Sequence, residues 1–130
     1  MNDSSIGFIG LGNVGSKIAN NIFSKGYNLY VHDLDEKKSH NLVSRGVIFC
    51  KSIEELIPKV SVLITCLPSP KSVKDVIEKC VPQLNHKHLW IEMSTTDEQD
   101  MKYLSKLVFD KKSEVLESPI TGGLHRAESG

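Results

Sequence analysis

Apolar residues along this chain follow two spacings that alternate with each other. Short runs rich in β-branched and aromatic residues are typical of strands, and segments with apolar residues three or four positions apart are typical of amphipathic helices. The first pattern predicts strands at residues 6–9, 28–33, 47–50, 60–67, 89–92 and 115–116. The second predicts helices at residues 13–25, 35–44, 52–58, 70–79 and 97–109, and residues from 118 onward are predicted to be loop.

This alternation of strands and helices predicts a parallel sheet with helices on both faces. Residues 60–67 are almost continuously apolar, as expected of a central strand buried on both sides. Because crossover connections are right-handed, the leading topology is a doubly wound, Rossmann-type α/β fold with six strands in the order 3-2-1-4-5-6. Ligands bind such folds beyond the carboxyl ends of strands one and four. We therefore expect a crevice between Gly10-Leu11-Gly12 and Cys66-Leu67-Pro68.

The first predicted strand runs into Gly10-Leu11-Gly12-Asn13-Val14-Gly15, a G-x-G-x-x-G motif that opens a helix. Gly10 permits a tight turn, Gly12 lacks the Cβ that would keep a diphosphate from the backbone, and Gly15 lets the helix pack closely on the strand. The helix N-terminus favours negative charge. The motif alone is weak, and it gains specificity from the preceding strand, the following helix and an acid about 20 residues on. We predict that residues 10–15 bind the diphosphate of a dinucleotide.

Asp33 is the acid at the expected distance, at the carboxyl end of the second predicted strand. Its carboxylate would accept hydrogen bonds from the adenosine ribose, each worth about 1.5–3 kcal/mol. A 2′-phosphate there would meet a like charge, at a cost on the order of 4 kcal/mol at 4 Å in an effective dielectric near 20. NAD is therefore expected rather than NADP, although Lys37 and Lys38 are near enough to reduce that repulsion. Two alternatives remain: Asp33 caps the next helix, or Asp35 is the partner of the ribose.

Three further segments lie at the ends of predicted strands or in the loops that follow them. Leu67-Pro68 would form a wall beside the ribose and nicotinamide, or simply a stiff loop that ends the strand. Ser94-Thr95 would offer a hydroxyl on the nicotinamide side, while Thr96 would cap the next helix. Thr121-Gly122-Gly123 would present backbone N–H groups to a carboxylate, and a generic glycine loop is an equal alternative.

Composition narrows the class of protein. The 130 residues suffice for one domain, and sixteen basic residues balance sixteen acidic ones, so nothing indicates a surface for nucleic acid or an anionic membrane. The sequence has no apolar run of about 18 residues and no secretory signal pattern, so a cytoplasmic protein is expected. Three cysteines, an odd number, fit reduced thiols. His86 and His88 have no evident third ligand, so no metal site is expected.

With these residues the chain resembles the β-hydroxyacid dehydrogenase family, which includes 3-hydroxyisobutyrate, tartronate semialdehyde and 6-phosphogluconate enzymes. Residues 7–15 look like the opening signature of that family. Glu117-Ser118-Pro119-Ile120-Thr121-Gly122-Gly123, followed by Ala127 and Gly130, is similar to its substrate motif D-A-P-V-S-G-G-x-x-x-A-x-x-G. The resemblance implies that Leu67, Pro68 and Thr95 contact the cofactor and that Thr121, Gly122 and Gly123 hold the substrate carboxylate. Ser94 is also predicted to bind the substrate.

The chain departs from the family pattern at a few of these positions. Glu117 and Thr121 replace the usual Asp and Ser, which keeps the chemistry and changes the reach of each side chain. Asp33 resembles the NAD-preferring members, since NADP-preferring ones tend to have Asn-Arg there.

Family members continue into an all-helical domain that supplies a catalytic lysine and most of the dimer contact, and no lysine here lies in such a segment. The resemblance therefore implies that residues 1–130 are the cofactor domain of a longer NAD-dependent 3-hydroxyacid dehydrogenase, of the 3-hydroxyisobutyrate or tartronate semialdehyde reductase type. This piece would hold no catalytic residue and be nearly inactive alone. Its partners would be a small carboxylate substrate and, through the missing domain, a second copy. The alternative is a non-catalytic dinucleotide-binding or scaffold module.

Overall fold

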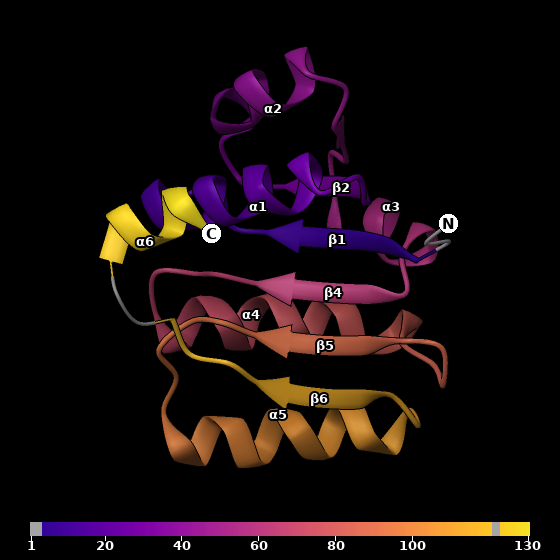
Figure 1. Ribbon diagram of the computed structural model, residues 1–130. Helices are drawn as coiled ribbons and strands as arrows, with labels where there is room; N and C mark the ends of the chain where they lie inside the picture. Colours follow the sequence, from indigo (N-terminus) through magenta and orange to yellow (C-terminus); the bar gives the residue numbers. More distant parts are fainter. Residues whose placement is uncertain (1–3, 121–122) are drawn as a thin grey trace.

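The computed structural model describes residues 4–120 and 123–130, and in that part of the chain it contains one six-stranded sheet (Figure 1). The strands lie in the order β3-β2-β1-β4-β5-β6, and all neighbouring pairs are parallel. Their bounds are β1 (Ser5–Ile9), β2 (Asn28–His32), β3 (Ile48–Phe49), β4 (Val62–Thr65), β5 (Leu89–Glu92) and β6 (Glu114–Glu117). The predicted Rossmann-type topology is confirmed.

Helices cover both faces of the sheet. Their bounds are α1 (Asn13–Ser24), α2 (His40–Ser44), α3 (Ile53–Leu56), α4 (Pro70–Cys80), α5 (Glu98–Asp110) and α6 (Gly123–Ser129), with 3₁₀ helices η1 (Glu36–Ser39), η2 (Ile57–Lys59) and η3 (Val81–Gln83). Apolar residues of α3, α4 and α5 share one core cluster, and residues of α1 and α2 share another. The central strands explain both clusters, because Phe8 of β1 and Leu63 of β4 are fully buried and belong to different ones.

Short polar side chains begin three of the helices, and for α5 the sequence predicts Thr96 in that place. Ser52 accepts a hydrogen bond from the Glu55 N–H at 3.1 Å at the start of α3. Ser69 accepts one from the Ser72 N–H at 3.1 Å at the start of α4. The prediction was wrong for α5, where the cap is not Thr96. Asp97 fills that place, because its carboxylate reaches the N–H groups of both Gln99 and Asp100.

The prediction of loop from residue 118 onward was wrong for residues 123–129, which form α6. This helix lies against α1 (Figure 1). The Asn21 side-chain amide donates to the Ala127 carbonyl, Lys17 pairs with Glu128 at 2.6 Å, and Ala127 is buried. The segment Gly-Leu-His-Arg-Ala-Glu-Ser has too little apolar periodicity to predict a helix. Contacts with α1 therefore stabilise α6, because its local helix propensity is not sufficient. In the described part of the chain no helix is long and apolar enough to cross a membrane.

Candidate functional site

The strand ends form a row at one edge of the sheet. In the register of the sheet Ile9 pairs with both His32 and Thr65, and Thr65 pairs with Glu92. The loops after β1, β2, β4 and β5 therefore emerge side by side. This is the place where the sequence predicts a binding crevice.

Gly10 closes the turn that leaves β1. Its φ of +104° lies in the left-handed region, which disfavours any side chain. A Cβ at Gly10 would also overlap the carbonyl oxygen of Cys66, which follows β4. Two constraints thus require glycine here, the backbone conformation and the close approach of the two strand ends.

Gly15 and Gly12 have opposite surroundings. A Cβ at Gly15 would overlap the carbonyl oxygen of Gly10, so α1 packs directly on the turn that precedes it. A Cβ at Gly12 would meet no atom within 4 Å, and its φ of −69° is one that other residues adopt. The structure thus accounts for Gly10 by its backbone conformation and by packing, and for Gly15 by packing. It leaves the main chain at Gly12 open to a ligand.

The N-terminus of α1 differs from those of α3, α4 and α5. Gly12 is its N-cap residue, and in the described part of the chain no side chain accepts a hydrogen bond from its first turn. The first N–H groups of a helix have no partner within the helix, and an anion is one of the groups that satisfies them. The remaining predicted residues of this motif lie in the same turn: Leu11 is buried, Asn13 is exposed and Val14 is half-buried.

Asp33 lies beside this turn, immediately after β2. Its Oδ2 accepts a hydrogen bond of 2.8 Å from the Leu11 N–H, and its Oδ1 accepts one of 2.8 Å from the Asp35 N–H. An ionised carboxylate has about four acceptor positions, so capacity for ribose hydroxyl groups remains. Asp35 is the residue that caps η1, by accepting from the Lys37 N–H. The first alternative for Asp33, capping of the next helix, therefore belongs to Asp35.

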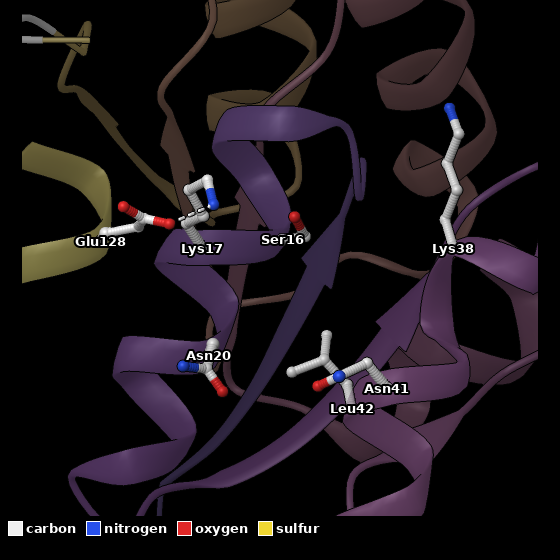
Figure 2. Close-up of a pocket in the computed structure, with 7 residues that line it drawn as sticks. All are labelled: Ser16, Lys17, Asn20, Lys38, Asn41, Leu42 and Glu128. Atoms are coloured by element: carbon white, nitrogen blue, oxygen red, sulfur yellow. Dashed lines mark hydrogen bonds and ion pairs between the residues drawn. The ribbon is translucent and has the colours of Figure 1, made fainter. Parts of the chain in front are cut away.

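The two lysines near Asp33 are both exposed. Lys38 lines a polar hollow of about 290 Å³ between α1, the segment containing η1 and α2, and Glu128 of α6. Figure 2 shows this hollow, with the Lys17–Glu128 pair on one side and Lys38 on the other. The remaining lining residues are Ser16, Asn20, Asn41 and Leu42.

The loops after β4 and β5 are joined by a hydrogen bond of 2.7 Å from the Leu67 N–H to the Ser94 hydroxyl oxygen. Ser94 is buried, whereas Pro68 and Thr95 are exposed. The two loops that carry the predicted cofactor residues Leu67, Pro68 and Thr95 are therefore held together through Ser94.

Glu92, the last residue of β5, is a functional candidate that the sequence did not single out. Only 1% of it is exposed. Its Oε1 accepts from the Ser94 N–H at 2.6 Å and from the Thr65 hydroxyl at 3.2 Å. Burial raises the pKa of this carboxyl, and the hydrogen bonds from Ser94 and Thr65 act in the opposite direction. The available signal was an acid directly after the apolar residues of a strand; Asp33 shares this signal and is identified in addition by its spacing from the glycine motif.

The predicted substrate motif is described only in part. Thr121 and Gly122 lie outside the described residues, so their assignment stays a prediction. Gly123 is exposed, has a φ of +70° and begins α6. Ala127 and Gly130, the last residues of the motif, face α1: Ala127 through its carbonyl, and Gly130 because a Cβ there would contact Asn21.

The remaining chemistry-bearing side chains have structural partners. Burial raises the pKa of the Cys66 thiol, which argues against a reactive thiolate beside the crevice. His88 is buried, with Nδ1 bonded to the Asn85 N–H and Nε2 to the Ile57 carbonyl. Among the described residues no group of three or more His, Cys, Asp or Glu side chains is placed to hold a metal ion.

These features fit a dinucleotide. The open main chain at Gly12 and the uncapped start of α1 suit a diphosphate, and the Asp33 carboxylate beside them suits a ribose. Residues 5–130 match the family described as the NAD binding domain of 6-phosphogluconate dehydrogenase. The chain belongs to this family. As an NAD-binding domain of the 6-phosphogluconate dehydrogenase family, it has the fold and the cofactor class that the sequence predicts.

Proteins similar to this domain include a probable mitochondrial 3-hydroxyisobutyrate dehydrogenase from Dictyostelium discoideum, 32% identical over 97% of this chain. The cytokine-like nuclear factor N-PAC from Pongo abelii is 24% identical over 98% of this chain. The chain spans 40% of the length of the first relative and 24% of the second. The first relative is named as mitochondrial. A cytoplasmic location of this chain stays a prediction.

Among solved structures, a Mycobacterium tuberculosis 3-hydroxyisobutyrate dehydrogenase with L-serine superposes with a TM-score of 0.90 at 24% identity. The superposition covers 97% of this chain and 43% of that one, and it confirms the fold. The resemblance to the β-hydroxyacid dehydrogenases, limited to their N-terminal domain, is thereby confirmed as well.

Proposed function

We propose that this domain binds NAD(H) as part of an NAD-dependent 3-hydroxyacid dehydrogenase, of the type that acts on 3-hydroxyisobutyrate or tartronate semialdehyde. The observation that carries the proposal is the turn at Gly12. Its main chain is open, it starts a helix without a side-chain cap, and the Asp33 carboxylate bonds to the adjacent Leu11 N–H. A turn that only connects a strand to a helix does not require these three features together.

In this proposal each residue has a binding or orienting role. The N–H groups at the start of α1 hold the diphosphate, and Asp33 accepts from the adenosine ribose. Leu67, Pro68 and Thr95 flank the nicotinamide side. Ser94 is assigned to the substrate, and Thr121, Gly122 and Gly123 are assigned to the substrate carboxylate. Bound NAD supplies a hydride acceptor. The chain itself supplies no catalytic residue, and the catalytic lysine and the dimer contact are assigned to a helical domain outside residues 1–130.

A preference for NAD over NADP is part of the proposal. The negative charge of Asp33 opposes a 2′-phosphate, and its two bonds to backbone N–H groups hold the carboxylate in place. Lys38 lines the neighbouring hollow. Among the described residues it forms no hydrogen bond or ion pair with Asp33. The repulsion is therefore expected to act against a 2′-phosphate.

Calorimetric titration of the 130-residue chain with NADH tests the proposal. Wild type should bind saturably below millimolar NADH, and Gly12→Ala should abolish binding while leaving the thermal midpoint little changed, because the added methyl group enters open space. Gly26→Ala is the matched control. Gly26 has a φ of +92° at the far end of α1, so this variant should lose about 1–2 kcal/mol of stability and keep NADH binding. Absence of saturable binding by wild type would refute the proposal.

A second candidate is a non-catalytic dinucleotide-binding or scaffold module, and the similarity to N-PAC favours it, since that relative is named as a nuclear factor. The two candidates share the NAD site and differ in the segment beyond Gly130. A helical segment there with the pattern G-x-x-x-K-x-x-N supports the dehydrogenase. If the natural protein lacks that lysine, the scaffold candidate is favoured.

A further inference from the structure

Glu92 is the most deeply buried acid in the described part of the chain, and the proposed function gives it no role. It lies between two neighbours in the register of the sheet, Thr65 on β4 and Glu117 on β6. Removing a carboxyl group from water costs free energy unless hydrogen bonds compensate for it. The groups that Glu92 contacts should therefore explain why an acid is buried at the edge of the crevice.

The contacts of Glu92 form one connected network. Oε1 accepts from the Thr65 hydroxyl, and the Thr65 oxygen in turn accepts from the Trp90 indole N–H at 2.8 Å. The same Oε1 accepts from the Ser94 N–H, and the Ser94 hydroxyl oxygen accepts from the Leu67 N–H. The carboxyl group therefore links the loop after β4 to the loop after β5 through hydrogen bonds of 2.6–3.2 Å.

The second carboxyl oxygen of Glu92, Oε2, is bonded differently from Oε1. Oε2 is buried and has no hydrogen-bond partner among the described residues. Burial raises the pKa of Glu92, and the charge of Glu117 acts in the same direction. The hydrogen bonds of this carboxyl group to its neighbours are therefore made through Oε1.

We propose that Glu92 is a positioning residue, whose buried Oε1 holds Ser94 and, through it, the Leu67 main chain in the geometry that receives the nicotinamide half of the cofactor. This inference rests on the proposed function, which places Leu67, Pro68 and Thr95 beside the nicotinamide. Glu92 itself does not contact the cofactor. Its loss should disturb one half of the site, because the diphosphate turn and Asp33 belong to β1 and β2.

The test compares NADH with ADP-ribose, which has the same adenosine and diphosphate but no nicotinamide. Calorimetry should show that Glu92→Leu weakens NADH about tenfold and ADP-ribose less than about twofold. Glu92→Gln keeps an acceptor at Oε1 and should restore NADH affinity to within about threefold of wild type. Glu114→Leu, on the exposed start of β6, is the matched control and should change neither affinity.

Ser94→Ala gives a second test that does not depend on replacing a buried acid. It removes the acceptor of the Leu67 N–H and leaves Glu92 in place, so it should also weaken NADH more than ADP-ribose. Equal losses for both ligands, or no loss for either, in variants with native circular dichroism would overturn the inference. Failure of wild type to bind both ligands would instead overturn the proposed function.

Discussion

Asp33 and Glu92 are both acids that follow an apolar strand at the same edge of the sheet, and the structure uses them differently. Asp33, after β2, is half-buried, and each of its oxygens accepts one backbone N–H. Glu92, at the end of β5, is almost completely buried, with two donors on one oxygen and none on the other in the described part of the chain. In sequence the two positions look alike.

The difference shows that access to solvent decides what an acid at a strand end does. Asp33 holds the glycine turn through Leu11 and keeps acceptor positions for a ligand. Glu92 has no accessible face and can act only on the loops that it joins. Variants of the two residues should therefore separate ligand recognition from the geometry of the site.

The largest expected effect is on cofactor affinity at Asp33. Asp33→Ala should weaken NADH about 10- to 150-fold, which corresponds to the loss of about 1.5–3 kcal/mol from hydrogen bonds to a charged acceptor. NADPH should lose much less, because the repulsion of its 2′-phosphate disappears together with the carboxylate. Parallel calorimetric titrations measure both affinities.

Asp35→Ala is the matched control for this prediction. Asp35 caps η1 two residues away, and its removal should lower stability slightly and leave the ratio of NADH to NADPH affinity unchanged. Equal losses of NADH and NADPH in Asp33→Ala would contradict the ribose assignment. Loss of discrimination in Asp35→Ala would transfer the role to Asp35.

A smaller effect is expected on the pH dependence of stability at Glu92. Its pKa in the folded state lies above the ordinary value of 4.5, so the folded protein binds the proton more tightly than the unfolded chain. That contribution is present below pH 4.5 and is lost as pH rises through the raised pKa. The free energy of unfolding of Glu92→Gln, measured with urea, should therefore improve relative to wild type as pH rises from about 4 to 7, by about 1.4 kcal/mol per unit of raised pKa.

Glu114→Gln, a substitution at an exposed position, should show no such trend against wild type. A difference between Glu92→Gln and wild type that stays constant over this pH range would mean that Glu92 keeps its ordinary pKa. The comparison with Asp33 would then rest on geometry alone.

Much of the fold and half of the site could be predicted from the sequence. Strand order comes from alternating patterns, and Gly10, Gly12, Gly15 and Asp33 come from their spacing, because each acts through its local backbone. Glu92 could not be identified in this way, since its importance comes from Thr65, Ser94 and Leu67, which the sheet brings to it. Helix α6 was missed for the same reason, because its stability depends on contacts with α1 more than on its own residues.

Glu128, which pairs with Lys17, is a third acid for this comparison, and the smallest effect is expected there. Glu128 is exposed, and Lys17 lowers its pKa, the reverse of what burial does to Glu92. The pair should therefore help to hold α6 on α1 above the ordinary pKa of Glu128 and weaken as pH falls.

Because solvent and salt screen an exposed pair, Lys17→Ala should raise the hydrogen-exchange rate of residues 123–130 only about twofold at low salt and not at all at high salt. Asn21→Leu, which removes the bond to the Ala127 carbonyl, should raise it further and independently of salt. An effect of Lys17→Ala that persists at high salt would show that the packing of the lysine stem, rather than its charge, holds the helix.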